Sequence, residues 1–288
     1  MAAILSLAAC GGSGDMNSRP ALASGDIREL AGLSAPVETG PEQQARQQDI
    51  FSRADSLIQS TVHLEGTVDG ETHSFRMMSE CSGATCTLVE PMTGVTDTTS
   101  LGMVEVVLGE AEAFGSAHGI TLMSETLNGT DKDLTDFGAW MQHSAFALET
   151  ERALLEEIDS TAVYAAALGE LTGRPPAGSA TWLGIMVGTP VAGDHEGDRL
   201  VGTAALNYDL DAGGLDAAFS GITNVDRGMA HDVETVFFVD LAVAPDGTFA
   251  RGQSGTRIQG GFYGPDHAEA AGVFEQSGIV GAFGAKKQ

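Results

Sequence analysis

Two cysteines in the first third of the chain, Cys81 and Cys86, are separated by four residues, Ser-Gly-Ala-Thr. Residues typical of strands lie on both sides of this segment, so a hairpin would bring the two cysteines within reach of a disulfide bond. The alternative is a metal site, which needs two more ligands, and His73 is the only nearby candidate. The ligand count therefore favours the disulfide.

Two of the seven histidines, His63 and His73, flank the Asp-Gly pair at 69–70, which is a strong signal for a hairpin turn. Their side chains could face each other across neighbouring strands, with Met77 and Met78 close by. Histidine and methionine are ligands that haem iron and copper accept. Two candidate ligands without a defined pocket are more typical of an ordinary surface or packed pair. We therefore assign no cofactor and keep haem binding as an alternative.

Motifs for catalysis are incomplete in this chain. The segment 252–256 approaches the nucleophile elbow of hydrolases, but it lacks the final glycine, and Ser254 lies between expected strands rather than before a helix. There is no phosphate-binding loop and no dinucleotide fingerprint. Asp209, Asp211 and Asp216 could bind calcium, but their spacing differs from that of an EF-hand loop, which favours acidic turn residues. We therefore expect no enzymatic activity and assign no catalytic or metal-binding residue.

The composition limits the possible partners. The chain has 14 lysines and arginines against 40 aspartates and glutamates, so its formal net charge is −26. This charge repels phosphate, which argues against nucleic acid and against electrostatic attachment to anionic lipid. Hydrophobic residues make up 42% of the chain and charged residues 19%, which is enough apolar content for a packed core. The 38 glycines favour turn-rich β structure.

The N-terminus, MAAILSLAACGGSGD, contains nine mainly small or apolar residues that end at Cys10. A helix needs about twenty apolar residues to span a bilayer, so this stretch is too short for that role. Leu-Ala-Ala-Cys at 7–10 resembles a bacterial lipobox, in which the cysteine is lipidated and becomes the mature N-terminus. No basic residue precedes the apolar run, so we expect the true start codon upstream. The alternative is a chance alanine-rich N-terminus with a free cysteine. Export would allow Cys81 and Cys86 to oxidise.

Three regions follow this signal segment at 1–10. Residues 11–41 are rich in Gly, Ser, Ala and Pro and are expected to form a flexible tether. Residues 42–173 are expected to form a β-rich N-terminal domain with one or two short helices. Apolar residues recur with helical spacing over Glu42–Gln59 and again over Glu149–Leu171, which predicts two helices. Strands are expected at Thr61–Val68, Glu71–Met78, Thr85–Val89, Met103–Leu108 and His118–Met123, while Phe137–Leu148 could be a strand or a helix.

Residues 178–288 form the expected C-terminal domain, after a Pro- and Gly-rich break at 174–179. Short strands separated by turns follow one another throughout. Five precede the C-terminal stretch, at Thr181–Gly188, Leu200–Asp209, Leu215–Ile222, Val233–Ala244 and Thr248–Arg251. Three more are expected between Ile258 and Lys287. Eight strands at this spacing favour an antiparallel β-barrel, which has no open edges.

The last thirty residues repeat a Gly-x-Phe triplet in each of the three expected strands. Residues two apart on a strand share a face, so each phenylalanine lies beside a position without a side chain. A ring on one strand could cover the glycine of its neighbour, which suits a tightly curved sheet. The six positions expected to close the barrel are Gly260, Phe262, Gly272, Phe274, Gly281 and Phe283.

The same residues carry a family resemblance. GFYGPDHAEAAGVF followed by IVGAFGAKK resembles the closing barrel strands of transferrin-binding-protein-B-like surface lipoproteins of Gram-negative bacteria. A weaker resemblance extends back to Trp182. The resemblance implies an eight-stranded barrel on a lipid-anchored protein that binds a partner and catalyses nothing, and it does not say which partner. We expect a monomer anchored to the outer membrane through Cys10 and exposed on the cell surface, which binds a host protein, a haemoprotein or a small iron-bearing ligand. The alternatives are a structural envelope lipoprotein, a haem-binding protein that uses His63 and His73, or an exported enzyme.

Overall fold

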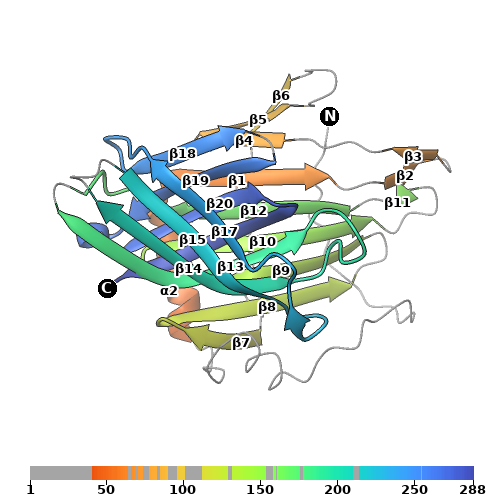
Figure 1. The fold of residues 1–288 in the computed structure, drawn as a ribbon, viewed down its shortest axis with the longest axis horizontal. Coiled ribbons are helices and arrows are strands. Elements are labelled where there is room, and N and C mark those ends of the chain that lie inside the picture. The colour runs from red at the N-terminus through yellow and green to blue at the C-terminus, as the bar shows by residue number, and fades with distance from the viewer. Residues whose placement is uncertain are drawn as a thin grey trace.

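The computed structural model describes most of the chain after residue 40 (Figure 1). The described residues are 41–63, 66–68, 71–73, 78–82, 85–89, 96–100, 112–128, 132–153, 158–159, 161–175, 178–209, 214–253 and 255–288. They are mainly β-strands, as expected, with one α-helix, α2 (Pro41–Arg53). No helix within these ranges has the length and apolar character to cross a bilayer. Cys10, the expected tether, Met103–Leu108, Asp211 and Ser254 lie outside the described residues.

Six strands form the N-terminal sheet, in the order β1-β12-β10-β9-β8-β7, and every neighbouring pair is antiparallel. Their bounds are β1 Ser56–His63, β7 Glu112–Ala117, β8 Ile120–Asn128, β9 Lys132–Trp140, β10 Ser144–Ala153 and β12 Thr161–Gly169. Helix α2 covers one face of this sheet, where Ile50 packs into a cluster with Trp140 and Leu168. The expected N-terminal helix is therefore confirmed, although it ends at Arg53 and β1 occupies the rest of the predicted range.

The helix expected over Glu149–Leu171 is wrong, because the structure places β10, β11 (Ile158–Asp159) and β12 there. β12 lies inside the sheet between β1 and β10 and is covered on both faces. Val163, Ala165 and Ala167 point to one core, while Ala166 and Leu168 point to the opposite side. A strand buried on both faces has a continuous apolar sequence, which periodicity cannot distinguish from a buried helix. The packing overrides the helix propensity of its alanines.

Two small three-stranded sheets accompany the N-terminal sheet, in the orders β11-β2-β3 and β4-β5-β6. Their remaining bounds are β2 Gly66–Val68, β3 Glu71–His73, β4 Met78–Ser82, β5 Thr85–Val89 and β6 Thr96–Ser100. The hairpins predicted around Asp-Gly 69–70 and between the two cysteines are both present in the strand pairing. The segment that could have been strand or helix, Phe137–Leu148, is divided between β9 and β10.

The C-terminal sheet follows the predicted strands closely. Its bounds are β13 Ser179–Pro190, β14 Leu200–Asp209, β15 Gly214–Asn224, β16 Met229–Ala230, β17 Thr235–Leu241, β18 Thr248–Gln253, β19 Thr256–Tyr263, β20 Glu269–Gln276 and β21 Ile279–Lys287. The path runs β15-β14-β13-β21-β20-β19-β18, and both β16 and β17 pair with the free edge of β15. The first long strand, β13, therefore pairs with the last, β21, as a closing sheet requires.

This sheet curls around a single core. Phe219 on β15 stacks on Phe274 on β20 with ring centroids 4.3 Å apart, although three strands separate β15 from β20 along the sheet. Neighbouring strands are about 4.8 Å apart, so a flat sheet could not bring these rings together. β17 and β18 are the two end strands of the curled sheet, and they are next to each other in the chain. Between them the pairing among the described residues is limited to a bridge between Val243 and Phe249, so no continuous ladder closes the barrel here. We call residues 235–241 and 248–253 the β17–β18 seam.

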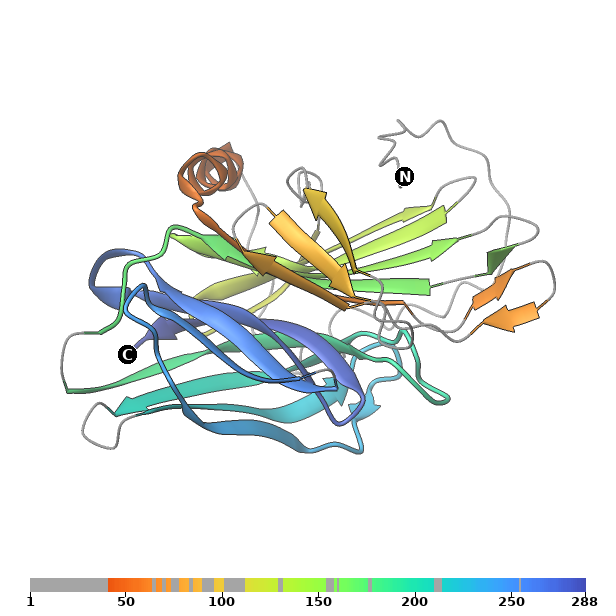
Figure 2. The same cartoon turned by 90° about the horizontal axis from the view of Figure 1, so that it is seen from above.

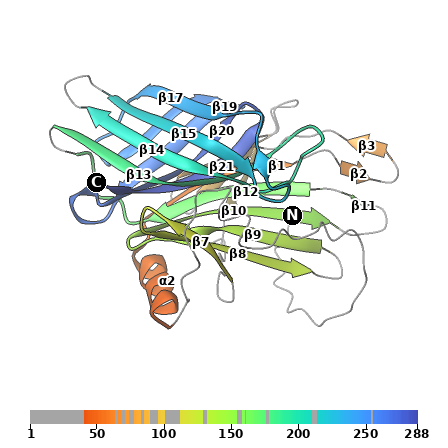
Figure 3. The same ribbon diagram turned by 60° about the horizontal axis from the view of Figure 1, so that its bottom comes forward.

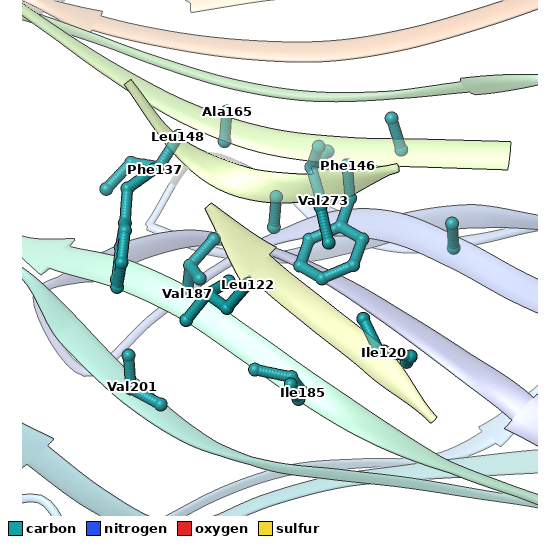
Figure 4. Close-up of a cluster of buried hydrophobic side chains, with 14 of the residues drawn as sticks. Ile120, Leu122, Phe137, Phe146, Leu148, Ala165, Ile185, Val187, Val201 and Val273 are labelled. Carbon is teal, nitrogen blue, oxygen red and sulfur yellow. The ribbon is translucent and has the colours of Figure 1, made fainter. Parts of the chain in front are cut away.

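The N-terminal sheet packs against the outside of this barrel, and Figure 2 shows the two layers edge-on. One hydrophobic cluster fills the space between them, with Phe137 and Phe146 from the N-terminal sheet against Ile185, Val187 and Val273 of the barrel (Figure 4). Helix α2 lies on the opposite face of the N-terminal sheet, away from the barrel (Figure 3). The molecule is therefore a barrel with one side covered and the other side open to solvent.

Candidate functional site

The interior of the barrel is filled by side chains. Trp182, Phe219, Phe262, Phe274 and Phe283 are all fully buried in one cluster that draws residues from all eight long strands. The rings of Trp182 and Phe262 lie 4.8 Å apart between centroids. A barrel of about eight strands is just wide enough for its own side chains. The interior therefore serves as a hydrophobic core.

The three phenylalanines of the Gly-x-Phe triplets, Phe262, Phe274 and Phe283, all point into this core. A Cβ added at Gly281 would lie 2.6 Å from the ring of Phe274, and one added at Gly272 would lie 2.8 Å from the ring of Phe283. The register pairs these residues directly, Gly272 with Phe283 and Phe274 with Gly281. Each ring thus covers the bare glycine of the neighbouring strand.

The first triplet differs in one respect. The ring that covers Gly260 belongs to Phe249 on β18, rather than to one of the three triplet phenylalanines. The outer face uses the same device, because a Cβ at Gly284 would meet the ring of Phe146 from the N-terminal sheet. Glycines therefore allow close approach both inside the barrel and between barrel and sheet.

Two buried carboxylates join the barrel to the N-terminal sheet. Glu269 accepts hydrogen bonds from the backbone N–H groups of Gln142 and His143, at 2.8 and 2.9 Å, and from the Ser144 hydroxyl at 2.9 Å. Glu275 lies 3.2 Å from the guanidinium of Arg257, and both side chains are almost fully buried. Arg257 also donates to the Ser60 hydroxyl of β1, at 2.6 Å. These contacts hold the two parts together and leave this face closed to a partner.

The loops at one end of the barrel are held by further ion pairs. The fully buried carboxylate of Asp198 accepts hydrogen bonds from Arg227 and from the amide of Asn224, both at 3.0 Å. Next to it, Arg199 binds Asp226 through its guanidinium, at 2.7 Å. These contacts tie the loop at 191–199 to the loop at 225–228, so this loop end has a defined shape. Arg199 also donates to Ser124 of the N-terminal sheet, at 2.8 Å.

The strand register pairs the two cysteines of the N-terminal region with each other, but it does not pair the two histidines. The register pairs His63 with Ala162 of β12, whereas His73 is paired with Gly66 of β2, so the two histidines are not opposite each other. Haem binding by this pair stays a prediction. Cys81 is directly opposite Cys86 in the β4–β5 hairpin. The backbone therefore has the register that a cross-strand disulfide needs, and the bond itself stays a prediction.

Asp209 and Asp216 also lie apart in the pairing, since Asp209 is opposite Gly214 and Asp216 is opposite Asn207. Within the described residues, no group of three or more His, Cys, Asp or Glu side chains is arranged to hold a metal ion.

No local sequence pattern indicates the row of carboxylates on the N-terminal sheet. Asp136 on β9 is paired with Glu125 of β8 on one side and with Glu149 of β10 on the other. Burial, followed by repulsion from Glu149 and Glu125, raises the pKa of Asp136 from 3.8 to about 8. Burial also raises the pKa of Tyr164, which is opposite Glu149 on β12. The three carboxylates are far apart in the sequence, so only the strand register reveals them.

A second feature that the sequence did not indicate is an apolar surface on β17. Phe237 is 59% exposed and Val239 is 43% exposed, although the run Val-Phe-Phe-Val reads as a buried strand. Val236 and Phe238, which alternate with them, point into the barrel core. The open side of the barrel therefore carries large apolar side chains next to the β17–β18 seam.

Comparisons with known proteins complete the description. No family model matches this chain, and a search of curated proteins finds no significant relative. Among solved structures, the chain is similar to a double mutant of the vaccine antigen transferrin-binding protein B from Haemophilus parasuis, with 17% identity and a TM-score of 0.42. The match covers 81% of this chain and 45% of that one. The chain thus spans less than half the length of that protein.

Two further structures are similar over the same share of the chain, 81%. One is the N-lobe domain of lactoferrin-binding protein B of Moraxella bovis, with 11% identity, a TM-score of 0.35 and all of that chain covered. The other is HpuA from Kingella denitrificans, solved in complex with human haemoglobin, with 13% identity, a TM-score of 0.35 and 90% of that chain covered.

Proposed function

We propose that this protein is a non-catalytic binding module, anchored by a lipid on Cys10 to the outer membrane of a Gram-negative bacterium and displayed on the cell surface. Its partner is a host protein, and transferrin, lactoferrin and haemoglobin are the first candidates, since these are the proteins named with the similar structures. Two further ligand classes, a haemoprotein and a small iron-bearing ligand, fit the family that the closing strands resemble.

One observation carries the proposal: the barrel core is closed by its own aromatic side chains. Phe262, Phe274 and Phe283 fill the space that a lipocalin-type barrel would leave for a small ligand. The interface with the N-terminal sheet is also filled, by hydrophobic side chains and by buried ion pairs. The surfaces left for binding are the loop ends and the open side of the barrel, and these suit a partner of protein size.

The test is direct binding by the full chain without its lipid, made with Cys10→Ser. Surface plasmon resonance against immobilised transferrin, lactoferrin and haemoglobin, with serum albumin as control, is expected to give saturable binding to one of the three. If a folded sample binds none of the three proteins, the result would support the alternative hypothesis of a structural envelope lipoprotein.

The haem alternative has its own measurement. Titration of haem into the same protein is expected to leave the Soret band at the position of free haem. A Soret shift that disappears in His63→Ala would instead support haem ligation by His63 and His73. Protease treatment of intact cells tests surface display, because a displayed protein is cleaved and an inward-facing one is protected.

A further inference from the structure

The open side of the barrel carries large exposed apolar side chains. Among the described residues, Phe237 and Val239 are two of the three large hydrophobic side chains classed as exposed, with Met229 the third. Phe237 and Val239 lie two apart on β17 and so share its outer face. The neighbouring outward position on β15 is Ala218, which is opposite Phe237, so no bulky side chain shields the ring on that side.

The backbone edge of β17 next to these side chains has little pairing. β15 is the ladder partner of β17 on one edge. On the other edge, in the described part of the seam, strand contact is confined to the hairpin, with the Val243–Phe249 bridge and a hydrogen bond from Ala244 N–H to the Thr248 carbonyl. Beyond the hairpin the two strands diverge (Figure 1). An open strand edge is a template for one more strand.

The local conformation keeps the seam open. Asp240 has a φ of 53°, in the left-handed region, and the pairing of β15 with β17 shifts register between Leu215 and Ala217. On β18, Gly252 has a φ of 94°. Such irregularities bend a strand, and here they turn β17 and β18 apart while each keeps its pairing with β15 and with β19. The guanidinium of Arg251 on β18 bonds the carbonyl of Val239, so a side chain reaches across the seam where a ladder would otherwise run.

The charges beside the seam are mostly negative. Asp232, Glu234 and Asp240 are exposed on β17 and on the turn before it, and Asp216 is exposed on the adjoining β15. The opposing cation at the seam is Arg251. A second copy of the chain would bring the same carboxylates against each other, and like charges disfavour such pairing. The surface is complementary to an extended segment that alternates basic and apolar side chains.

We propose that the β17 edge, with Phe237 and Val239, is a docking site for an extended segment of a partner protein that adds a strand to β17. The apolar side chains of that segment pack on Phe237 and Val239, and its basic side chains, on the other face of the added strand, meet Asp232, Glu234 and Asp240. This inference rests on the proposed binding function and names the surface that performs it. Charged groups on an edge strand discourage unwanted pairing, and here they select a basic segment over an acidic one.

The test uses the full chain with Cys10→Ser and a fluorescent eight-residue peptide in which Lys and Val alternate. Fluorescence anisotropy is expected to show saturable binding that Phe237→Ser weakens about tenfold, as loss of a central apolar anchor does. The matched control is Met229→Ser, which removes a similarly exposed apolar side chain outside β17. It is expected to bind as the parent does. Hydrogen exchange is expected to slow at 235–241 when the peptide is bound.

Peptide controls test the two halves of the proposal. A peptide that alternates Glu and Val tests the charge preference, and one with Pro in place of two central Val residues tests strand addition, because Pro cannot donate to a ladder. Both are expected to bind at least about tenfold more weakly than the Lys-Val peptide. Equal binding of the Glu-Val peptide, equal loss in the Phe237→Ser and Met229→Ser variants, or protection elsewhere would overturn the proposal. Concentration-dependent dimerisation in sedimentation that Phe237→Ser abolishes would also overturn it, in favour of a second copy.

The outcomes separate this inference from the proposed function. If the chain binds a host protein and Phe237→Ser leaves that affinity unchanged, the docking site is wrong and the function stands. If the Lys-Val peptide binds at β17 and no host protein is bound, the docking site stands and the proposed partner class is wrong.

Discussion

The barrel and the N-terminal sheet bury carboxylates in opposite surroundings. At the barrel interface, Glu275 is paired with Arg257, and Glu269 accepts three hydrogen bonds. On the outer face of the N-terminal sheet, Asp136 lies between two other carboxylates. The barrel interface thus gives each buried acid a cation or hydrogen-bond donors, whereas the N-terminal sheet places three acids side by side. Stability of the two regions should therefore respond differently to substitution and to pH.

The largest effect is expected from Phe274→Ala in the barrel core. The Phe274 ring is fully buried, stacks on Phe219 and covers Gly281. Its removal leaves a cavity, because the paired strands around it hold their positions and cannot collapse into the space. The free energy of unfolding should fall by about 3–5 kcal/mol. Phe237→Ala, at an exposed position, should change it by less than about 0.5 kcal/mol. Urea unfolding of both variants measures the difference, and similar values would contradict the filled core.

Arg257→Ala should give the next largest loss. It leaves the buried carboxylate of Glu275 without its cation, which costs about 3 kcal/mol or more. The control is Arg53→Ala, which breaks exposed pairs with Asp49 and Glu170 and should cost less than about 1 kcal/mol. Urea unfolding at pH 7 compares the two, and an equal loss would mean that the Arg257 pair is not protected from solvent.

Asp136→Asn should instead stabilise the protein above neutral pH. The folded pKa of about 8 lies above the ordinary 3.8, so the folded state holds a proton that the unfolded state releases. The contribution of this group to stability is complete below about pH 4 and is lost as the pH rises towards 8. The variant should be more stable than the parent at pH 8.5, by a larger margin than at pH 4. The exposed Asp194→Asn variant is the control for the substitution itself. A gain that is the same at both pH values would refute the assignment.

The smallest effect is expected from Asp246→Ala in the hairpin between β17 and β18. Hydrogen bonds from the backbone and hydroxyl of Thr248 lower the pKa of Asp246. Its contribution, about 0.5–1 kcal/mol, is present above the ordinary pKa and is lost as the pH falls below it. Thermal unfolding of the parent and variant should therefore differ at pH 7 and converge near pH 2. A difference that grew on acidification would reverse the assigned sign.

The barrel could be predicted from the sequence because the alternation of residue types along its strands reflects which side chains are buried and which are exposed. β14 begins and ends at the residues expected, Leu200 and Asp209, since inward apolar residues alternate with outward polar ones and turns follow. The three closing strands were confirmed for the same reason, together with their glycines. The prediction for β12 was wrong because this strand is buried on both faces, so its sequence does not alternate between apolar and polar residues.

The candidate surfaces could be predicted less well. Nothing in the run Val-Phe-Phe-Val indicates that Phe237 is exposed, because exposure follows from where β18 diverges from β17. The row formed by Glu125, Asp136 and Glu149 depends on the register of three strands. A one-residue slip of a strand would move its side chain to the opposite face. Pairing of this kind is a long-range property that local patterns do not encode.

The pairing of β13 with β21 has a consequence for how the chain matures. β21 follows β13 and β20 in the chain, and in the sheet it lies between them and pairs with both. Before β21 pairs, β13 and β20 each have an unpaired edge, and phenylalanine side chains of the barrel core are exposed to solvent. Contacts between such distant segments form slowly. A folding intermediate in which β21 has not yet paired would therefore expose apolar surface and unpaired strand edges, both of which favour aggregation.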